Sequence, residues 1–204
     1  SIAATMLLKY REAGFAAGHS LGEFSALISA GALSFEDGLK HIQKRGELMQ
    51  DAGEKNKGTM AAIIGLDPVV LKEVCNDAST DGIVQIANIN SPGQIVISGS
   101  VEGVRKAMAL AKEKGAKLVK ELVVHGAFHS PLMESAKKDF KTALDNTEFR
   151  KVRIPVYSNL TAKPITKDTD PKVIRESLFE QLTSPVMWQE SVMNMIKDGA
   201  TEFV

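Results

Sequence analysis

Short apolar runs of strand length alternate along this chain with longer stretches in which apolar residues return every three or four positions. The first pair is an expected strand over 15–17 and an expected helix over 21–30, which Gly31 would end. A second helix is expected over 35–50. The polar residues 51–58 include two glycines and are expected to form a linker.

The middle of the chain has its own order of elements. Asp67 and Ser100 stand where they can cap helices, and apolar runs predict four strands around these helices. The expected elements are a strand at 59–64, a helix at 68–78, strands at 83–88 and 94–98, a helix at 101–114 and a strand at 118–124. This βαββαβ order is that of a ferredoxin-like unit, so residues 58–123 are predicted to form a subdomain.

Alternation of strands and helices resumes after this unit, so residues 1–57 and 124–204 are predicted to form one α/β core. The expected elements are a helix from Ser130-Pro131 to about 144, a strand at 152–158, and helices opened by Asp170-Pro171 and Ser184-Pro185. A helix over 1–12 and a strand beginning at 202–204 suggest a chain that is truncated at both ends.

Composition excludes several classes of protein. The formal net charge is zero, with 25 basic and 25 acidic residues, and no basic run is interleaved with aromatics as in a nucleic-acid binder. The single cysteine, Cys75, cannot form an internal disulfide, and no Cys/His cluster has metal-ligand spacing. No apolar run approaches the roughly 18 residues that a membrane span needs. A cytoplasmic protein without nucleic-acid or membrane partners is therefore expected.

Candidate chemistry begins at Gly18-His19-Ser20-Leu21-Gly22, which matches the G-x-S-x-G pattern between an expected strand and an expected helix. This context is that of a nucleophile elbow, in which a tight turn exposes the serine hydroxyl. The backbone N–H of Leu21 would then be one donor to a developing oxyanion. The alternative is that Ser20 only caps the following helix.

A nucleophilic serine needs a base, and the chain offers four histidines. His19 adjoins Ser20 and would point elsewhere from a tight turn, and His41 falls in mid-helix, where it is expected at the surface. His129 lies just before a helix start, where a loop can present it to a cleft. His129 and His125 both remain candidates, against the alternative of structural histidines.

Several stretches, in order, resemble the malonyl-CoA:acyl carrier protein transacylases of fatty acid synthesis and their relatives, the acyltransferase domains of polyketide synthases. They are Gly18-His19-Ser20-Leu21-Gly22-Glu23 with Phe24-Ser25-Ala26-Leu27; Lys44-Arg45-Gly46 with Met49-Gln50; Asn88-Ile89-Asn90-Ser91-Pro92-Gly93-Gln94; Gly126-Ala127-Phe128-His129-Ser130; and Gln181-Leu182 with Pro185-Val186 and Trp188. The family's fold is an α/β-hydrolase-like core with an inserted ferredoxin-like subdomain, in agreement with the βαββαβ order.

The resemblance implies roles for individual residues. Ser20 would be the nucleophile and His129 the base, oriented by a main-chain carbonyl at Gln181 instead of by an aspartate. Arg45, which on its own would be taken for a solvated arginine, would hold the malonyl carboxylate through a two-pronged contact. Phe128 would favour malonyl over methylmalonyl.

Asn88 and Asn90 match residues near the family's substrate channel, although both could simply form a turn. The implied reaction transfers malonyl from malonyl-CoA to the phosphopantetheine thiol of acyl carrier protein through malonyl-Ser20, with no bound metal or redox cofactor. The alternatives are an acyltransferase of polyketide synthesis, an α/β serine hydrolase such as a thioesterase, and a non-catalytic carrier-docking module. The family's upstream Gly-Gln-Gly-x-Gln loop, with a second oxyanion donor, and its later Gly-Pro-Gly segment have no counterpart in these residues.

Overall fold

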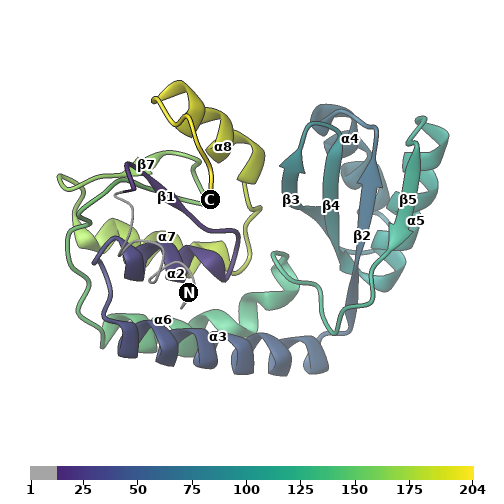
Figure 1. The fold of residues 1–204 in the computed structure, drawn as a ribbon. Helices are drawn as coiled ribbons and strands as arrows, with labels where there is room; N and C mark the ends of the chain where they lie inside the picture. The colour runs from purple at the N-terminus through teal and green to yellow at the C-terminus, as the bar shows by residue number, and fades with distance from the viewer. Residues whose placement is uncertain (1–12) are drawn as a thin grey trace.

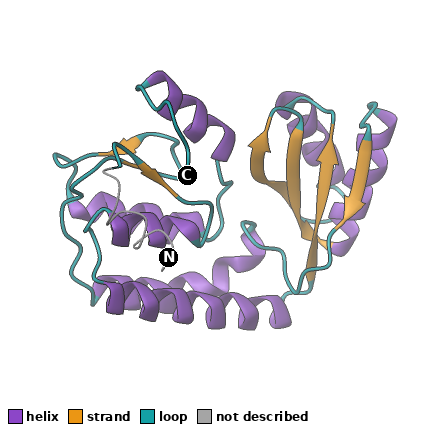
Figure 2. Cartoon of the chain, in the orientation of Figure 1, coloured by secondary structure: helices purple, strands orange, loops and turns teal. Residues whose placement is uncertain are grey.

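The strands form two separate sheets in the computed structural model, which describes residues 13–204 (Figure 1). The smaller sheet joins three very short strands in the order β1-β6-β7, with β1 parallel to β6 and β6 antiparallel to β7. The larger sheet is antiparallel, in the order β3-β4-β2-β5. The two sheets lie at opposite sides of the molecule, left and right in Figure 2. The helix expected over 1–12 lies outside the described residues.

The larger sheet and the two helices that pack on it are the six elements predicted for the middle of the chain, in the predicted order. They are β2 (Gly58–Ile64), α4 (Pro68–Ala78), β3 (Val84–Ser91), β4 (Gln94–Ser100), α5 (Val101–Glu113) and β5 (Leu118–Glu121). Asp67 and Ser100 cap the two helices as expected, each accepting a backbone N–H with its side chain. A buried apolar cluster of its own lies between this sheet and the two helices. The last strand ends at Glu121, three residues earlier than predicted.

The remaining part surrounds the smaller sheet with helices. Its elements are β1 (Ala16–Ala17), α2 (Gly22–Ser29), α3 (Phe35–Lys55), a 3₁₀ turn at Pro131–Met133, α6 (Glu134–Asp145), β6 (Val156–Tyr157), β7 (Pro164–Ile165), α7 (Pro171–Gln181) and α8 (Trp188–Lys197). The long helix α3 packs along α6, below α2 and α7 in Figure 1. A second buried apolar cluster joins α2, α3, α6 and α7.

The linker predicted over 51–58 is wrong, because α3 continues to Lys55. Gly53 explains the error. A Cβ at this position would lie 2.4 Å from the carbonyl oxygen of His125, so the glycine allows a close approach of two segments instead of ending the helix.

Three other predicted elements differ from the structure. The strand over 152–158 is reduced to β6, and 202–204 form no strand. The last helix begins at Trp188 instead of at Ser184-Pro185, because the segment between forms a bridge to β3. In that bridge, Val186 N–H donates to the Ala87 carbonyl.

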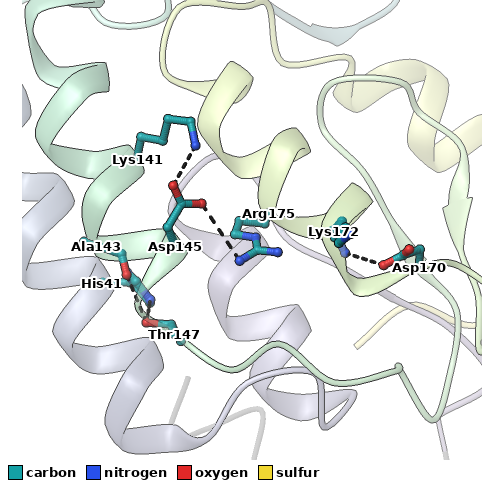
Figure 3. Close-up of polar contacts among 8 residues, drawn as sticks. All are labelled: His41, Lys141, Ala143, Asp145, Thr147, Asp170, Lys172 and Arg175. Atoms are coloured by element: carbon teal, nitrogen blue, oxygen red, sulfur yellow. Dashed lines mark hydrogen bonds and ion pairs between the residues drawn. The ribbon is translucent and has the colours of Figure 1, made fainter.

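His41 was expected at the surface and is instead buried between α3 and α6. Its Nε2 lies 2.9 Å from the Thr147 hydroxyl, which itself donates to the Ala143 carbonyl (Figure 3). Since that hydroxyl has only one hydrogen, His41 Nε2 carries the proton in this contact. The ring also packs against the rings of Phe24, Phe140 and Phe149, which fill this side of the core.

Charged contacts at the surface join α6 to α7 nearby. Asp145 accepts from Lys141 at 2.6 Å and lies 3.9 Å from Arg175 (Figure 3). Asp170 caps α7 by accepting the backbone N–H of Lys172, as predicted. Exposed pairs of this kind contribute little to stability, so the packing of α6 against α7 depends on the buried apolar cluster that these helices share.

Candidate active site

The turn between β1 and α2 has the geometry expected of a nucleophile elbow. Ser20 has a φ of +53°, a left-handed backbone conformation that few non-glycine residues adopt. A Cβ at Gly18 would lie 1.9 Å from the Gly22 carbonyl oxygen, so only glycine fits there. Ser20 makes no side-chain bond to the start of α2. The interpretation of Ser20 as a simple helix cap is therefore wrong.

Asn159 holds this turn in place. Its Oδ1 accepts the Ser20 N–H at 2.6 Å, and its Nδ2 donates to the Gly18 carbonyl at 2.8 Å. Sequence reasoning missed this residue. The signal was present, because Asn159 closely follows β6, which runs parallel to β1, and the carboxyl ends of parallel strands meet at one edge of a sheet.

His129 is bonded to the hydroxyl of Ser20, with 2.8 Å between Nε2 and Oγ. Its Nδ1 lies 2.9 Å from the main-chain carbonyl oxygen of Gln181, which can only accept, so Nδ1 carries the proton and Nε2 is free to take one. Burial and, to a smaller extent, the positive charge of Arg45 together lower the pKa of His129 to about 4, against the bond to Gln181. His129 is therefore neutral at physiological pH and can act as a base.

Arg45 lies beside the same hydroxyl. Its Nη2 donates to Ser20 Oγ at 2.8 Å and to Gln181 Oε1 at 3.1 Å. The side chain is only 5% exposed, so the interpretation as a solvated arginine is wrong. Burial lowers its pKa to about 10, which leaves it charged at neutral pH. Its Nε is buried and has no partner among the described residues.

Known proteins with similar sequences show the family to which this chain belongs. Residues 3–204 match the acyl transferase domain family. The chain belongs to this family. It is 47% identical over 204 residues to the malonyl CoA-acyl carrier protein transacylase of Bacillus subtilis, covering 98% of this chain and 63% of that protein. The chain thus spans less than two thirds of the length of this relative.

Solved structures agree with the sequence comparison. An acyl carrier protein S-malonyltransferase from Vibrio cholerae superposes with a TM-score of 0.91 at 38% identity, over 98% of this chain and 65% of that one. A malonyl-transacylase in complex with a type II PKS acyl-carrier protein gives 0.91 at 35% identity, over 98% and 64%. The α/β fold is shared with these members of the family.

A cleft of about 870 Å³ opens over Ser20. One face of α3, from Arg45 past Met49 to Glu54, forms a wall of this cleft, and Phe128 and Asn88 also line it. Asn90 lies beside it, where its Oδ1 bonds to Nε2 of His19 at 2.9 Å.

The four histidines are now separated by position. His125 is exposed at the rim of the cleft, and His41 lies in the α3–α6 seam. His129 alone of the four is bonded to Ser20, so it is the base that the geometry favours. The Leu21 N–H has no acceptor among residues 13–204 and is free to meet an oxyanion.

Glu23 is the other residue that sequence reasoning missed. It stands in the first turn of α2 and is 1% exposed. Burial raises the pKa of its carboxyl to about 7, against hydrogen bonds from Gln181 and Asn159 and the charge of Arg45. It falls within the stretch that resembles the family, but it was given no role, because an acidic residue in a first helical turn is ordinary.

Residues 13–204 contain neither a metal-binding group nor a membrane-spanning helix. There, no three His, Cys, Asp or Glu side chains are grouped so as to hold a metal ion. No helix over 13–204 has the length and apolar character to cross a membrane.

Proposed function

We propose that this chain carries the site that transfers malonyl from malonyl-CoA to the phosphopantetheine thiol of an acyl carrier protein in fatty acid biosynthesis. The observation that carries the proposal is a buried arginine within 2.8 Å of an activated serine, with Nε left unpaired. Such a guanidinium calls for a substrate that brings its own carboxylate. The names of the relatives point to the same acyl group.

The first half-reaction begins at Ser20. His129 Nε2 takes the hydroxyl proton as Oγ attacks the thioester carbonyl, and the Leu21 N–H, at the start of α2, stabilises the oxyanion. The thioester bond then breaks, CoA leaves with the proton held by His129, and malonyl-Ser20 remains. The Gln181 carbonyl keeps the imidazole in one tautomer and favours the charged form that arises in between.

Arg45 selects the acyl group. A planar guanidinium meets a carboxylate with two parallel hydrogen bonds, and the unpaired Nε leaves one such donor free. Holding the malonyl carboxylate there would set its thioester carbonyl beside Ser20 Oγ.

The second half-reaction reverses the first. The carrier's thiol gives its proton to His129, its sulfur attacks the malonyl-serine ester, and Ser20 recovers the proton as it leaves. The cleft gives a route for the long phosphopantetheine arm.

Phe128 and the two asparagines shape the rest of the site. Phe128 lines the cleft and packs against the apolar cluster of α2, α3, α6 and α7 and against a small cluster of Met60, Ala87 and Val96. Its ring would therefore crowd the branch of methylmalonyl. Asn88 lines the channel, and Asn90 fixes His19 next to the nucleophile.

The two sheets support a division into two structural units. We propose that residues 58–123 are a ferredoxin-like subdomain inserted into an α/β-hydrolase-like core of residues 1–57 and 124–204. The strand order β3-β4-β2-β5 with two helices on one face supports the first, and the parallel pair β1–β6 next to the elbow supports the second.

A serine hydrolase such as a thioesterase fits the site less well. It requires an acid behind the histidine, whereas His129 Nδ1 faces a main-chain carbonyl. It also gives no role to the buried Arg45.

The test is covalent loading. Incubation of the full-length protein with malonyl-CoA should add one malonyl group to the peptide that contains Ser20, as detected by mass spectrometry. Ser20→Ala should load nothing, and Ser25→Ala, which changes a partly buried serine on α2, should load normally. Malonyl on another residue, or none in the wild type, would overturn the proposal.

A further inference from the structure

Glu23 is a buried carboxyl group that the proposed mechanism does not use. Its Oε1 accepts the backbone N–H of Asn159 at 3.3 Å, and its Oε2 accepts Nε2 of Gln181 at 2.5 Å. No lysine or arginine of the described residues forms an ion pair with it. Burying a carboxylate costs free energy unless hydrogen bonds compensate for the lost water. The two donors to Glu23 supply such bonds, and the question is what the buried group does for the site.

The side chain of Gln181 links this carboxyl to the site. Its Nε2 faces two acceptors, the Glu23 carboxylate and the Ser20 carbonyl, the latter at 3.2 Å. Because the NH₂ end of the amide points to these acceptors, its oxygen must point the opposite way, to Nη2 of Arg45 at 3.1 Å. Glu23 and the Ser20 carbonyl thus fix the orientation of the amide together, and Glu23 makes the shorter of the two contacts.

Arg45 depends on that orientation. Its two bonds among the described residues both run from Nη2, one to Ser20 Oγ and one to Gln181 Oε1. Ser20 Oγ becomes an ester oxygen when the serine is acylated. The Gln181 oxygen is therefore the one acceptor of these two that is unchanged throughout the reaction cycle.

We propose that Glu23 is a positioning residue, which acts through the amide of Gln181 to fix the guanidinium of Arg45 beside Ser20. This inference rests on the proposed function of Arg45 as the carboxylate-binding group. It assigns malonyl selectivity partly to a residue that touches neither substrate nor nucleophile side chain.

The choice of glutamate over glutamine follows from the same contacts. A carboxylate accepts at both oxygens, so it serves Asn159 and Gln181 together. A glutamine at position 23 has one oxygen only. If that oxygen accepts from Asn159, its NH₂ faces the NH₂ of Gln181. A flip of the Gln181 amide relieves this repulsion, but it gives up the bond to the Ser20 carbonyl and turns a donor toward Arg45.

The first test compares loading by malonyl-CoA and acetyl-CoA in the full-length wild type, Glu23→Gln and Ser177→Ala. We expect Glu23→Gln to lower the malonyl-to-acetyl ratio of kcat/KM by roughly tenfold or more, through a higher KM for malonyl-CoA, with acetyl loading little changed. Ser177 lies on α7, the same helix as Gln181, and forms a buried hydrogen bond with Ser158. Ser177→Ala removes this bond and should leave the ratio unchanged. An unchanged ratio in Glu23→Gln, or an equal loss for both acyl groups, would overturn the inference.

A double-mutant cycle asks whether Glu23 acts through Gln181. Gln181→Met removes the amide at similar size, and it should lower the ratio as well. Glu23→Gln should then have no further effect on the ratio in the Gln181→Met background. Additive losses would contradict the relay.

A third measurement needs no variant and remains available if Glu23→Gln does not fold. The charged group that faces Glu23 is Arg45, and the pKa of the carboxyl is raised to about 7. Protonation converts one acceptor oxygen to a hydroxyl, so the wild-type ratio should fall from about pH 8 to about pH 6. A flat ratio would contradict the inference. If the wild type loads no malonyl at all, the proposed function fails instead, which separates the two outcomes.

Discussion

Two histidines of this protein are equally buried, yet their surroundings differ. His41 and His129 are each 3% exposed, and burial lowers the pKa of both. His41 lies among three phenylalanine rings and donates to Thr147. His129 lies between a main-chain carbonyl and the hydroxyl of Ser20, at the floor of a cleft.

The difference shows that burial and a lowered pKa do not mark a catalytic histidine by themselves. What marks His129 is the partner at its free nitrogen, a hydroxyl that is reachable from the cleft. Its backbone also sets it apart, because His129 has a φ of +57°, a strained conformation of the kind that is concentrated at functional sites. His41 sits in an ordinary helix, and its partner is a hydroxyl already committed to the Ala143 carbonyl.

The strongest test of the difference between the two histidines is to replace each one and measure malonyl loading. His129→Ala should slow malonyl loading by about 10⁴-fold or more, because the nucleophile and base act as a unit. His41→Phe keeps the aromatic packing and should load at close to the wild-type rate. Single-turnover loading followed by mass spectrometry measures both. If His41→Phe lost as much as His129→Ala, the assignment of the base would be wrong.

Arg45 extends the comparison, since it lies one helical turn after His41 on the same face of α3 but belongs to the surroundings of His129. Removing one partner of a desolvated charge pair costs roughly 2–5 kcal/mol, so Arg45→Ala should slow malonyl loading by that amount of free energy. Acetyl loading should hold or improve, because acetyl leaves the wild-type guanidinium unpaired.

Two controls make this measurement specific. Arg45→Lys should rescue malonyl loading only in part, since lysine cannot make the two-pronged contact. Lys44→Ala removes the neighbouring exposed cation and should change neither rate. If Arg45→Ala slowed both acyl groups equally, Arg45 would be structural.

The comparison also shows where sequence reasoning succeeds. The elbow was predictable because G-x-S-x-G constrains backbone shape, and the structure confirms its need for glycine at Gly18. The four strands of the larger sheet and its two helices were predictable because capping residues and apolar runs are local signals. Both are properties of short segments, which a sequence displays directly.

Contacts between distant segments were not predictable from the residues alone. His41 was expected at the surface because nothing near it reveals that Phe140 and Phe149 will cover it. Gly53 was taken for a linker residue because its close neighbour, His125, lies far along the chain. Glu23 and Asn159 act through partners more than a hundred residues away. The roles of Arg45 and Gln181 came from the resemblance to a family instead of from their own surroundings.

The smallest expected effect concerns stability and pH, and it tests the structural half of the comparison. Burial lowers the pKa of His41 below its ordinary value of 6.5, with Asp37 opposing the shift. The unfolded chain therefore binds a proton at this residue more readily than the folded protein does. The stability that His41 contributes is complete above pH 6.5 and is lost as the pH falls below that value.

Each such histidine lowers the free energy of unfolding by at most about 1.4 kcal/mol per pH unit below that point. His129 has the same sign, so the wild type should lose stability from both. His41→Phe should lose less, because only one of the two histidines whose pKa is lowered by burial remains. Urea unfolding of both proteins at about pH 7.5 and about pH 5.5 measures this difference. If the two proteins lost equal stability on acidification, burial would not hold His41 neutral. The two histidines would then share only their small exposed area.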